Sequence, residues 1–244
     1  MKNNLYLSVV IPAYNEEEKI KNTIQKVSEF LNSYKFLSEI IIVDDGSADK
    51  TLPAAKAEAK RHKRRIKIFK NNPNQGKGYA LKKGMTRARG EMVLFMDADL
   101  STPLGTFDRM LPFLKNGYDI VMGSRHLPDS KFLVYQPIWR QKIGRIFNKI
   151  VFAFFIKKIT DTNCGFKAYK NLVAKDLYSR LTINRWGFDV EVIYMAQKFG
   201  YRIKEVPVKW TDDPRTKVNI IKAMFSTLKE LAQIKINDWR GLYK

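Results

Sequence analysis

Cysteine, acidic residues and long apolar runs are all scarce in this 244-residue chain. Its single cysteine, Cys164, excludes an internal disulfide and favours a reducing compartment. The longest fully apolar run, residues 151–156, is far shorter than the roughly 18 residues that a membrane span requires. A polar N-terminus leads directly into a predicted strand at 5–11, so we expect no signal peptide. These absences predict a protein that is not integral to a membrane.

Only 24 aspartates and glutamates stand against 45 lysines and arginines, and the formal net charge is +21. A solvated basic surface accounts for part of this excess, but its size predicts an anionic partner. Nucleic acid, a membrane surface and a phosphorylated substrate are the three classes that fit. The hydrophobic fraction of 45% is ordinary for a globular protein with a packed core. The positions of the charges therefore have to decide among the three classes.

Apolar strand patterns alternate with helical patterns through the first half of the chain. Strands are predicted at 5–11, 39–44, 66–70, 91–96 and 119–123, and helices at about 16–33, 48–62, 77–89 and 104–115. Further on, the pattern predicts helices near 171–181 and 188–199, a strand near 202–210 and a final amphipathic segment from about 218. This alternation is typical of an α/β fold with a mainly parallel sheet covered by helices on both faces.

Two carboxylates follow the predicted strand at 91–96. Asp97 and Asp99 are separated by Ala98, and alternate side chains of an extended chain point to the same side. Hard oxygen ligands of this kind suit Mg²⁺ or Mn²⁺, which water and substrate phosphates usually complete. A D-x-D pair also occurs by chance and as a helix cap, but open α/β sheets bind ligands at the carboxyl ends of their strands. The pair therefore predicts a metal site rather than a cap.

Four further motifs follow predicted strands, at the same edge of the sheet. IPAYNEE at 11–17 and VDDGSADKT at 43–51 could hold a nucleoside, although the first also fits an ordinary helix cap. NQGKG at 74–78 allows close approach to a ligand and offers Lys77 to a phosphate, and a glycine turn with a solvated lysine is the equal alternative. GSR at 123–125 offers a bidentate phosphate donor. Since neither a G-x-G-x-x-G fingerprint nor a Walker A loop is present, the combination predicts a nucleoside-diphosphate site of another kind.

These motifs and several later ones carry a family resemblance that covers nearly the whole chain. The stretches are VVIPAYNEE at 9–17, VDDGSADKT at 43–51, NQGKG at 74–78, MDADLS at 96–101, GSR at 123–125, DTNCGFKAY at 161–169, GFDVE at 187–191 and EVPVKW at 205–210. They resemble the inverting family 2 glycosyltransferases of the GT-A fold. The later motifs are most similar to the polyprenyl-phosphate sugar transferases, which include glucosyltransferases and mannose synthases that act on dolichyl phosphate.

The resemblance implies a GT-A catalytic domain at 1–212, with amphipathic interface helices, and a C-terminal amphipathic segment at 213–244. It implies inverting, metal-dependent transfer of a sugar, with glucose favoured, to a polyprenyl phosphate of the dolichyl type. The donor would be a nucleotide sugar of the UDP-glucose or GDP-mannose type. Thr211 stands where the mannose synthases carry an arginine, which counts against a mannose-type donor.

The motifs and the resemblance together imply roles for individual residues. The nucleotide sugar would be held by Pro12, Ala13, Tyr14, Glu16, Val43, Asp45, Lys77, Asp97, Ala98, Asp99, Arg125 and Lys217. Asp97 and Asp99 would bind Mg²⁺ or Mn²⁺. The metal, Arg125 and Lys217 would stabilise the departing diphosphate.

Asp189 and Asp161 match carboxylates that serve, or are proposed to serve, as the catalytic base in related enzymes. Each could equally be a helix cap or the partner of a basic side chain. A phosphate acceptor needs little help from a base, because its second pKa lies near ~6 and it is mostly dianionic at neutral pH. We therefore expect Asp189, Asp161 and Arg125 to form the catalytic group, and we leave the identity of the base open.

Segment 131–158 contains seven lysines and arginines and no acidic residue. Apolar residues recur at helical spacing from 143 to 154, and basic residues fall on a different face, which predicts a basic amphipathic helix beginning near Trp139. A core-facing helix with a solvated side is the alternative, but the apolar end of the segment and the absence of acids favour a membrane surface. We expect Arg140, Lys142 and Arg145 to bind the acceptor's phosphate.

The C-terminal segment 215–244 repeats the pattern, with seven basic residues against two acidic ones. Trp239 and Tyr243 are its candidate interfacial anchors. We therefore expect a peripheral protein on the cytoplasmic face of a membrane. A soluble family 2 transferase that acts on a saccharide or protein remains an alternative. A nucleic-acid partner is disfavoured. A nucleic-acid-binding module needs basic residues interleaved with exposed aromatic residues, whereas this chain carries acidic residues at 44, 45, 97 and 99.

Overall fold

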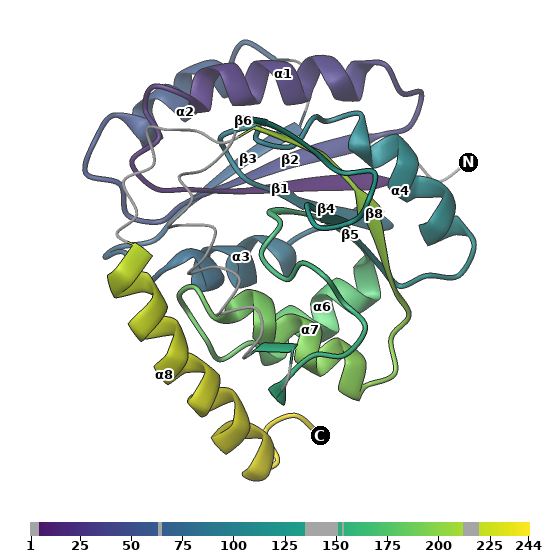
Figure 1. Cartoon of the computed structure of the whole chain (residues 1–244). Coiled ribbons are helices and arrows are strands. Elements are labelled where there is room, and N and C mark those ends of the chain that lie inside the picture. Colours follow the sequence, from purple (N-terminus) through teal and green to yellow (C-terminus); the bar gives the residue numbers. More distant parts are fainter. Residues whose placement is uncertain (1–4, 63–64, 135–150, 153, 212–219) are drawn as a thin grey trace.

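The computed structural model describes residues 5–62, 65–134, 151–152, 154–211 and 220–244. Its centre is a seven-stranded sheet in the order β3-β2-β1-β4-β7-β5-β8 (Figure 1). The strands are β1 (Leu7–Ala13), β2 (Ser38–Asp44), β3 (Arg65–Lys70), β4 (Met92–Met96), β5 (Ile120–Ser124), β7 (Phe166–Lys170) and β8 (Ile203–Pro207). Six of them run parallel, and β7 is antiparallel to both of its neighbours. The predicted mainly parallel sheet is confirmed.

Helices cover both faces of the sheet, as predicted (Figure 1). One face carries α1 (Ile20–Asn32), α2 (Thr51–Ala59) and α4 (Thr106–Lys115), and the other carries α3 (Lys77–Met85), α6 (Asn171–Arg180) and α7 (Phe188–Lys198). The last helix, α8 (Ile220–Trp239), packs against α7. No helix in the described part of the chain is both long enough and apolar enough to cross a bilayer.

The alternation of side chains along the strands divides the core between the two faces. In β2, Ile40 and Ile42 join the cluster under α1 and α4, whereas Ile41 and Val43 join the cluster under α3 and α7. All four side chains are inaccessible to solvent. A strand that is buried on both faces has a continuous run of apolar residues in its sequence, and this run predicted β2.

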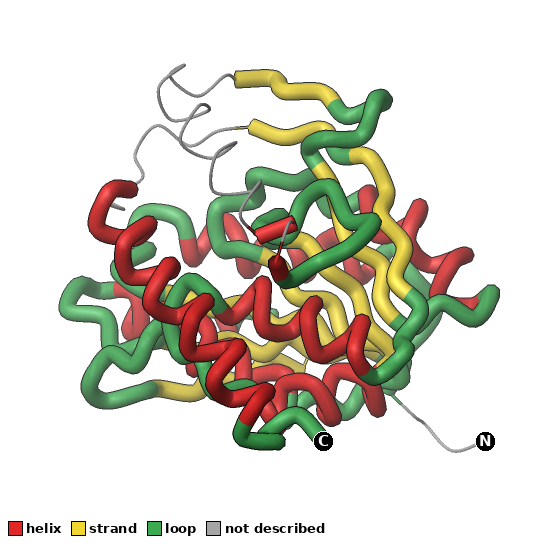
Figure 2. Tube along the Cα trace, turned by 60° about the horizontal axis from the view of Figure 1, so that its bottom comes forward, coloured by secondary structure: helices red, strands yellow, loops and turns green. Residues whose placement is uncertain are grey.

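Two strands escaped the sequence analysis. β7 is a short antiparallel strand whose two lysines interrupt its apolar pattern. Lys131–Val134, at the start of the basic segment 131–158, forms β6, and it pairs with β9 (Lys209–Thr211) in a small ribbon that extends beyond the main sheet (Figure 2). The predicted strand at 202–210 is therefore two strands, β8 and β9.

The apolar residues predicted to face a membrane divide between core and surface. Val151 and Ile156 are fully buried, and Phe152 and Phe155 pack against the same core cluster, so this end of segment 131–158 faces inward except at Phe154. Phe154 is 67% exposed. Residues 135–150 and 153 of this segment, which include the predicted start of the basic helix near Trp139, lie outside the described residues.

The prediction that Tyr243 is an interfacial anchor is wrong. Its side chain is fully buried, its ring lies 6.3 Å from that of Tyr194, and its hydroxyl donates a hydrogen bond to Glu191 of α7. Trp239, four residues earlier, is 88% exposed.

Candidate active site

The predicted site motifs meet at one edge of the sheet because β1, β2 and β4 run parallel and end together. β7 runs the other way, so it begins at that edge: Phe166 lies opposite Met96, the last residue of β4. The backbone N–H of Asp97 accordingly donates to the carbonyl of Gly165 at 3.1 Å. The antiparallel strand therefore brings the DTNCGFKAY motif directly beside the D-x-D motif.

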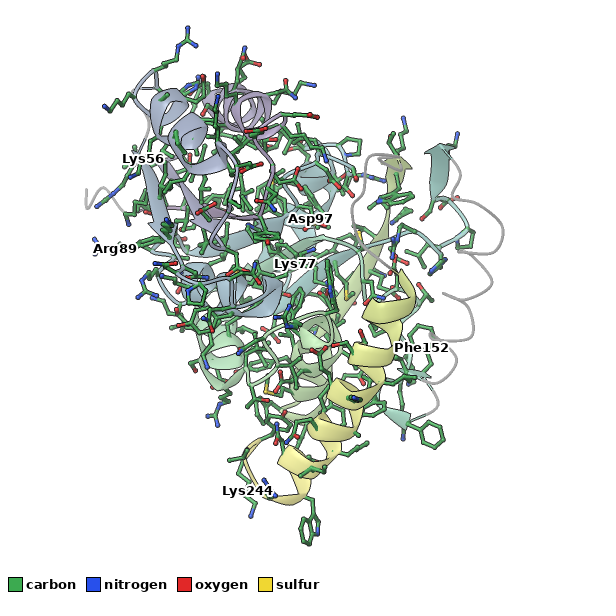
Figure 3. The ribbon with its side chains drawn as sticks, turned by 90° about the vertical axis from the view of Figure 1, so that its left-hand side faces the viewer. Lys56, Lys77, Arg89, Asp97, Phe152 and Lys244 are labelled. Carbon is green, nitrogen blue, oxygen red and sulfur yellow. The ribbon has the colours of Figure 1, made fainter. Side chains whose placement is uncertain are left out.

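The Asp97 carboxylate faces a cation from another element. Lys77 Nζ lies 2.6 Å from Asp97 Oδ1, and the two side chains are 24% and 30% exposed. Figure 3 shows them adjacent in the middle of the molecule. Asp99 accepts a hydrogen bond from the Ser101 backbone N–H at 2.9 Å. Burial and the neighbouring charge of Asp97 raise the pKa of Asp99 above its ordinary value.

These two carboxylates fit a hard divalent cation. A small hollow beside them is lined by Met96, Asp97, Asp99, Leu100, Ser101, Thr102, Gly165, Phe166 and Trp210. Two crowded carboxylates, one with a raised pKa, are an arrangement that a divalent ion relieves. Within the described residues no group of three or more His, Cys, Asp or Glu side chains could hold a metal, so the phosphates of a ligand and water would complete the coordination of an ion here.

Gly165 leaves the room that Asp97 occupies. A Cβ built on Gly165 would lie 1.9 Å from Asp97 Oδ2 and 2.4 Å from its Cγ, so a side chain there would displace the carboxylate. The sequence analysis did not single out this glycine. Only the antiparallel pairing of β4 with β7 reveals its proximity to Asp97.

We expect Gly165→Ala to reduce transfer by about 10²-fold, because a displacement of about 1 Å in a catalytic group has an effect of that size. Binding of Mn²⁺ should weaken with it. Gly105→Ala is the matched control, because its added Cβ would meet only Asp108 Oδ2, at 3.9 Å. Wild-type activity in Gly165→Ala would contradict the placement of Asp97 at the reaction centre.

The glycine-rich loop is held in place by Asp45. Its carboxylate, on a residue only 3% exposed, accepts hydrogen bonds from the Asn71 and Asn74 side chains and from the backbone N–H groups of Gln75 and Gly76, at 2.7–3.1 Å. It thereby positions the first residue of α3, Lys77. The role of Asp45 as a nucleoside ligand stays a prediction, since the structure engages its carboxylate with this loop.

The other predicted nucleoside ligands gather at the ends of β1 and β2. Tyr14 presents a ring that is 50% exposed, whereas the Ala13, Val43 and Ala98 side chains are buried. Glu16 follows in the same loop, and its backbone N–H donates to Thr51 Oγ1 at 2.7 Å. Pro12 lies within β1, opposite Val43 of β2. The first two strands therefore bring these residues together, and their contacts with a donor remain predictions.

Arg125 and Asp161 form an ion pair at the end of β5. Arg125 Nε and Nη2 donate to Asp161 Oδ2 and Oδ1 at 2.7 and 2.9 Å, and the Arg125 backbone N–H adds a third bond at 3.0 Å. Although burial of Asp161 opposes ionisation, the Arg125 charge and these bonds hold its pKa well below the ordinary range. Glu205 supports the turn by accepting from the backbone N–H groups of Thr160 and Asp161. Asp161 is therefore a partner for Arg125 and a poor proton acceptor.

Asp189 has a similar counter-ion. It lies at the start of α7 and contacts Lys167 of β7, a lysine only 1% exposed. Burial raises the pKa of Asp189, and the charges of Lys167 and Lys77 oppose that rise. Lys167 is a residue that the sequence analysis missed, although it stands in the DTNCGFKAY motif. Both candidate bases are thus paired with cations.

The remaining predicted ligands, Lys217, Arg140, Lys142 and Arg145, lie outside the described residues. Trp210 is a further side chain that was missed. It lines the hollow beside Asp97, and the Arg125 guanidinium carbon lies 5.3 Å from the centroid of its ring. A carboxylate pair, a basic group and aromatic side chains thus lie together at the carboxyl ends of parallel strands, an arrangement whose chemistry fits a metal-bound diphosphate.

The fold and this site define the class of protein as a glycosyltransferase of the GT-A fold. The profile of Glycosyl transferase family 2 matches residues 8–178, and the chain belongs to that family. It is 36% identical, over 99% of its length and 77% of the relative's, to a dolichyl-phosphate beta-glucosyltransferase of Dictyostelium discoideum. It is 33% identical to the Drosophila melanogaster enzyme of the same name, over 99% of this chain and 78% of that one.

Solved structures show the same fold at lower sequence identity. A mannosyl-3-phosphoglycerate synthase from Rubrobacter xylanophilus superposes with a TM-score of 0.73 at 15% identity, covering 97% of this chain and 75% of that one. The glucosyl-3-phosphoglycerate synthase of Mycobacterium tuberculosis, in complex with Mn²⁺ and UDP-glucose, gives a TM-score of 0.66 at 20% identity, covering 92% and 78%. These likenesses establish the GT-A fold.

Proposed function

We propose that this enzyme transfers glucose from UDP-glucose to a polyprenyl phosphate with inversion. The observation that carries the proposal is that both candidate bases are paired with cations, Asp161 with Arg125 and Asp189 with Lys167. A site in which both of these candidate bases are paired suits an acceptor that is already ionised, and a phosphate monoester is such an acceptor at neutral pH. The two relatives named above, both dolichyl-phosphate beta-glucosyltransferases, support the same acceptor.

The proposed role of each residue follows from its position in the site. Asp97 and Asp99 would hold Mg²⁺ or Mn²⁺, which supplies Lewis-acid stabilisation of the donor's diphosphate. Lys77 and Arg125 would add positive charge near that diphosphate. An oxygen of the acceptor phosphate bonds to the anomeric carbon from the face opposite the diphosphate. The bond from that carbon to the diphosphate oxygen breaks, and the nucleoside diphosphate leaves with the electron pair.

A panel of acceptors tests the proposal. With UDP-glucose and Mn²⁺, we expect transfer to a short polyprenyl phosphate at a rate at least about 10²-fold above that to the free polyprenol, because the alcohol needs a general base. GDP-mannose in place of UDP-glucose tests the donor. Equal transfer to phosphate and alcohol, or transfer only to a saccharide or protein, would instead support the alternative of a soluble family 2 transferase. Transfer to 3-phosphoglycerate alone would exclude the lipid acceptor, and because that compound also carries a hydroxyl group, it would contradict a phosphate nucleophile unless the product were a glucosyl phosphate.

We further propose that the enzyme acts as a peripheral protein at the cytoplasmic face of a membrane. The end of α8 supports this: Trp239 is 88% exposed and Leu242 53% exposed, and basic residues lie beside them at Arg240 and Lys244. Exposed aromatic and aliphatic side chains surrounded by lysine and arginine suit an anionic interface.

We expect Trp239→Ser to weaken binding to phosphatidylserine-containing vesicles by several-fold in a flotation assay, and added salt to weaken binding of the wild type, because each nearby basic residue contributes about 1 kcal/mol. Leu37→Ser, which removes a 48% exposed apolar side chain just before β2, is the matched control. If both variants bound equally well, the end of α8 would not be the membrane contact.

A further inference from the structure

The Lys77–Asp97 ion pair occupies the place where a metal cation would bind one of its two protein ligands. Lys77 Nζ lies 2.6 Å from Asp97 Oδ1. Burial opposes the charge of this ammonium, but the charges of Asp97, Asp189 and Asp99 raise its pKa, so it is a cation at neutral pH. The carboxylates therefore have a counter-ion that belongs to the protein itself.

The backbone around Lys77 is fixed by tight packing, so a change of partner has to come from its flexible side chain. A Cβ on Gly76 would lie 2.4 Å from the Asn184 carbonyl oxygen, and one on Gly78 would lie 2.5 Å from that of Ile183, so both glycines pack tightly against the loop before α7. The four-carbon stem of a lysine is flexible. Its ammonium lies over the rings of Phe95 and Trp186, at 5.4 and 5.9 Å from their centroids. Any change of partner is thus a change in the Lys77 side chain alone.

Asp189 does not depend on Lys77, because Lys167 pairs with it directly. Among the described residues, Lys77 is the cation that forms an ion pair with Asp97, and the Asp97 carboxylate is 30% exposed. If Lys77 turned away, Asp97 would need another cation. The diphosphate of the donor would attract the Lys77 ammonium, and the metal that binds with it would supply a new cation for Asp97.

We propose that Lys77 is an exchangeable counter-ion, which neutralises Asp97 in the free enzyme, competes with the divalent metal, and moves to the donor's diphosphate when metal and nucleotide bind together. This inference rests on the proposed donor site and deepens it. Lys77 makes binding of the metal and binding of the diphosphate mutually dependent, so the metal alone binds weakly. Such coupling between two ligands is reciprocal.

Lys77→Met tests the exchange, because methionine retains most of the stem, removes the charge and adds no oxygen ligand. Mn²⁺ affinity without nucleotide, measured from the electron paramagnetic resonance signal of free Mn²⁺, should rise about tenfold, within the usual range of such couplings. Affinity for UDP at saturating Mn²⁺ should fall. The upward shift of melting temperature on adding Mn²⁺ alone should be larger than in the wild type, because the stabilisation by a ligand grows with the logarithm of its concentration divided by its Kd.

Lys77→Arg and Lys56→Met are the controls. The first retains a cation and should keep the weak Mn²⁺ binding of the wild type. The second removes an exposed lysine on α2, far from Asp97 in Figure 3, and should change neither affinity.

Unchanged or weaker Mn²⁺ binding in Lys77→Met would overturn the competition, and unchanged or tighter UDP binding would overturn the move to the diphosphate. Failure of the wild type to bind UDP at any Mn²⁺ concentration would refute the proposed donor site instead. The Mn²⁺ affinity measured without nucleotide would still test, independently, whether Lys77 competes with the metal.

Discussion

Asp99→Ala should lose transfer activity by at least about 10²–10³-fold, the usual effect of removing one preorganised electrostatic contact at a reaction centre. Excess chelator should reduce the wild type in the same way. The fold should survive, because the Asp99 carboxylate makes a local bond to the Ser101 N–H rather than a core contact. The raised pKa of Asp99 gives the sign of the change in stability, because the folded state disfavours the ionised carboxylate. Removing this carboxylate at pH 7 should therefore leave the melting temperature unchanged or raise it.

Asp129→Ala provides the comparison for this experiment. Asp129 is an exposed carboxylate near the end of β5, and it lines a separate hollow next to β8. We expect this variant to retain wild-type transfer. Full activity in Asp99→Ala, or in excess chelator, would eliminate the proposed metal site.

Asp161→Asn should both destabilise the protein and inactivate it. Removing one partner of a buried ion pair costs about 3–5 kcal/mol, because the other charge stays buried without compensation. Asp161 is 1% exposed, and the Arg125 side chain is 19% exposed. Since the pKa of Asp161 is lowered in the folded state, its contribution is complete above the unfolded pKa of about 3.9 and is lost as the pH falls below it. The variant should therefore show a flatter loss of stability in acid.

Chemical denaturation of wild type and variant between pH 2 and pH 7 measures this difference. Asp238→Asn serves as the control, since it weakens the more exposed pair with Lys198, and surface pairs contribute about 0–1 kcal/mol. Equal unfolding free energies for wild type and Asp161→Asn at pH 7 would show that the Arg125 pair does not support the fold.

The sequence predicted those parts of the fold that depend on local patterns. The strands that are buried on both faces, such as β2, and the strongly amphipathic α1 lie within a few residues of their predicted positions. β7 was missed because only five residues form it and two of them are lysines. One of these, Lys167, is buried because Asp189, distant in sequence, neutralises it. No local pattern encodes a pairing of that kind.

The candidate site shows the same division. Asp97, Asp99, Lys77 and Arg125 were predicted from motifs at strand ends, and parallel strands bring such ends together. The pairings of Lys77 with Asp97 and of Arg125 with Asp161 could not be assigned from the sequence, because the two members of each pair come from different elements. Tyr243 shows the opposite error: an aromatic residue in a basic segment suggested an interface, but a hydrogen bond to Glu191 and contact with Tyr194 keep it inside.

The Arg125–Asp161 pair also closes the base of a long excursion of the chain between β5 and β7. Ser124 Oγ and Thr160 Oγ1 lie 2.7 Å apart beside this pair, and the Glu205 carboxylate of β8 accepts hydrogen bonds from the backbone N–H and the hydroxyl of Thr160. Val151 and Ile156 keep their places in the core, and β6 stays paired with β9. Because the free energy of closing a loop changes slowly with its length, the sequence between Val134 and Val151 can vary without disturbing the sheet. This part of the chain can therefore be exchanged for the corresponding part of a relative. We expect that grafting the corresponding segment from a relative between Val134 and Val151 would alter acceptor choice while the donor half of the enzyme stays intact.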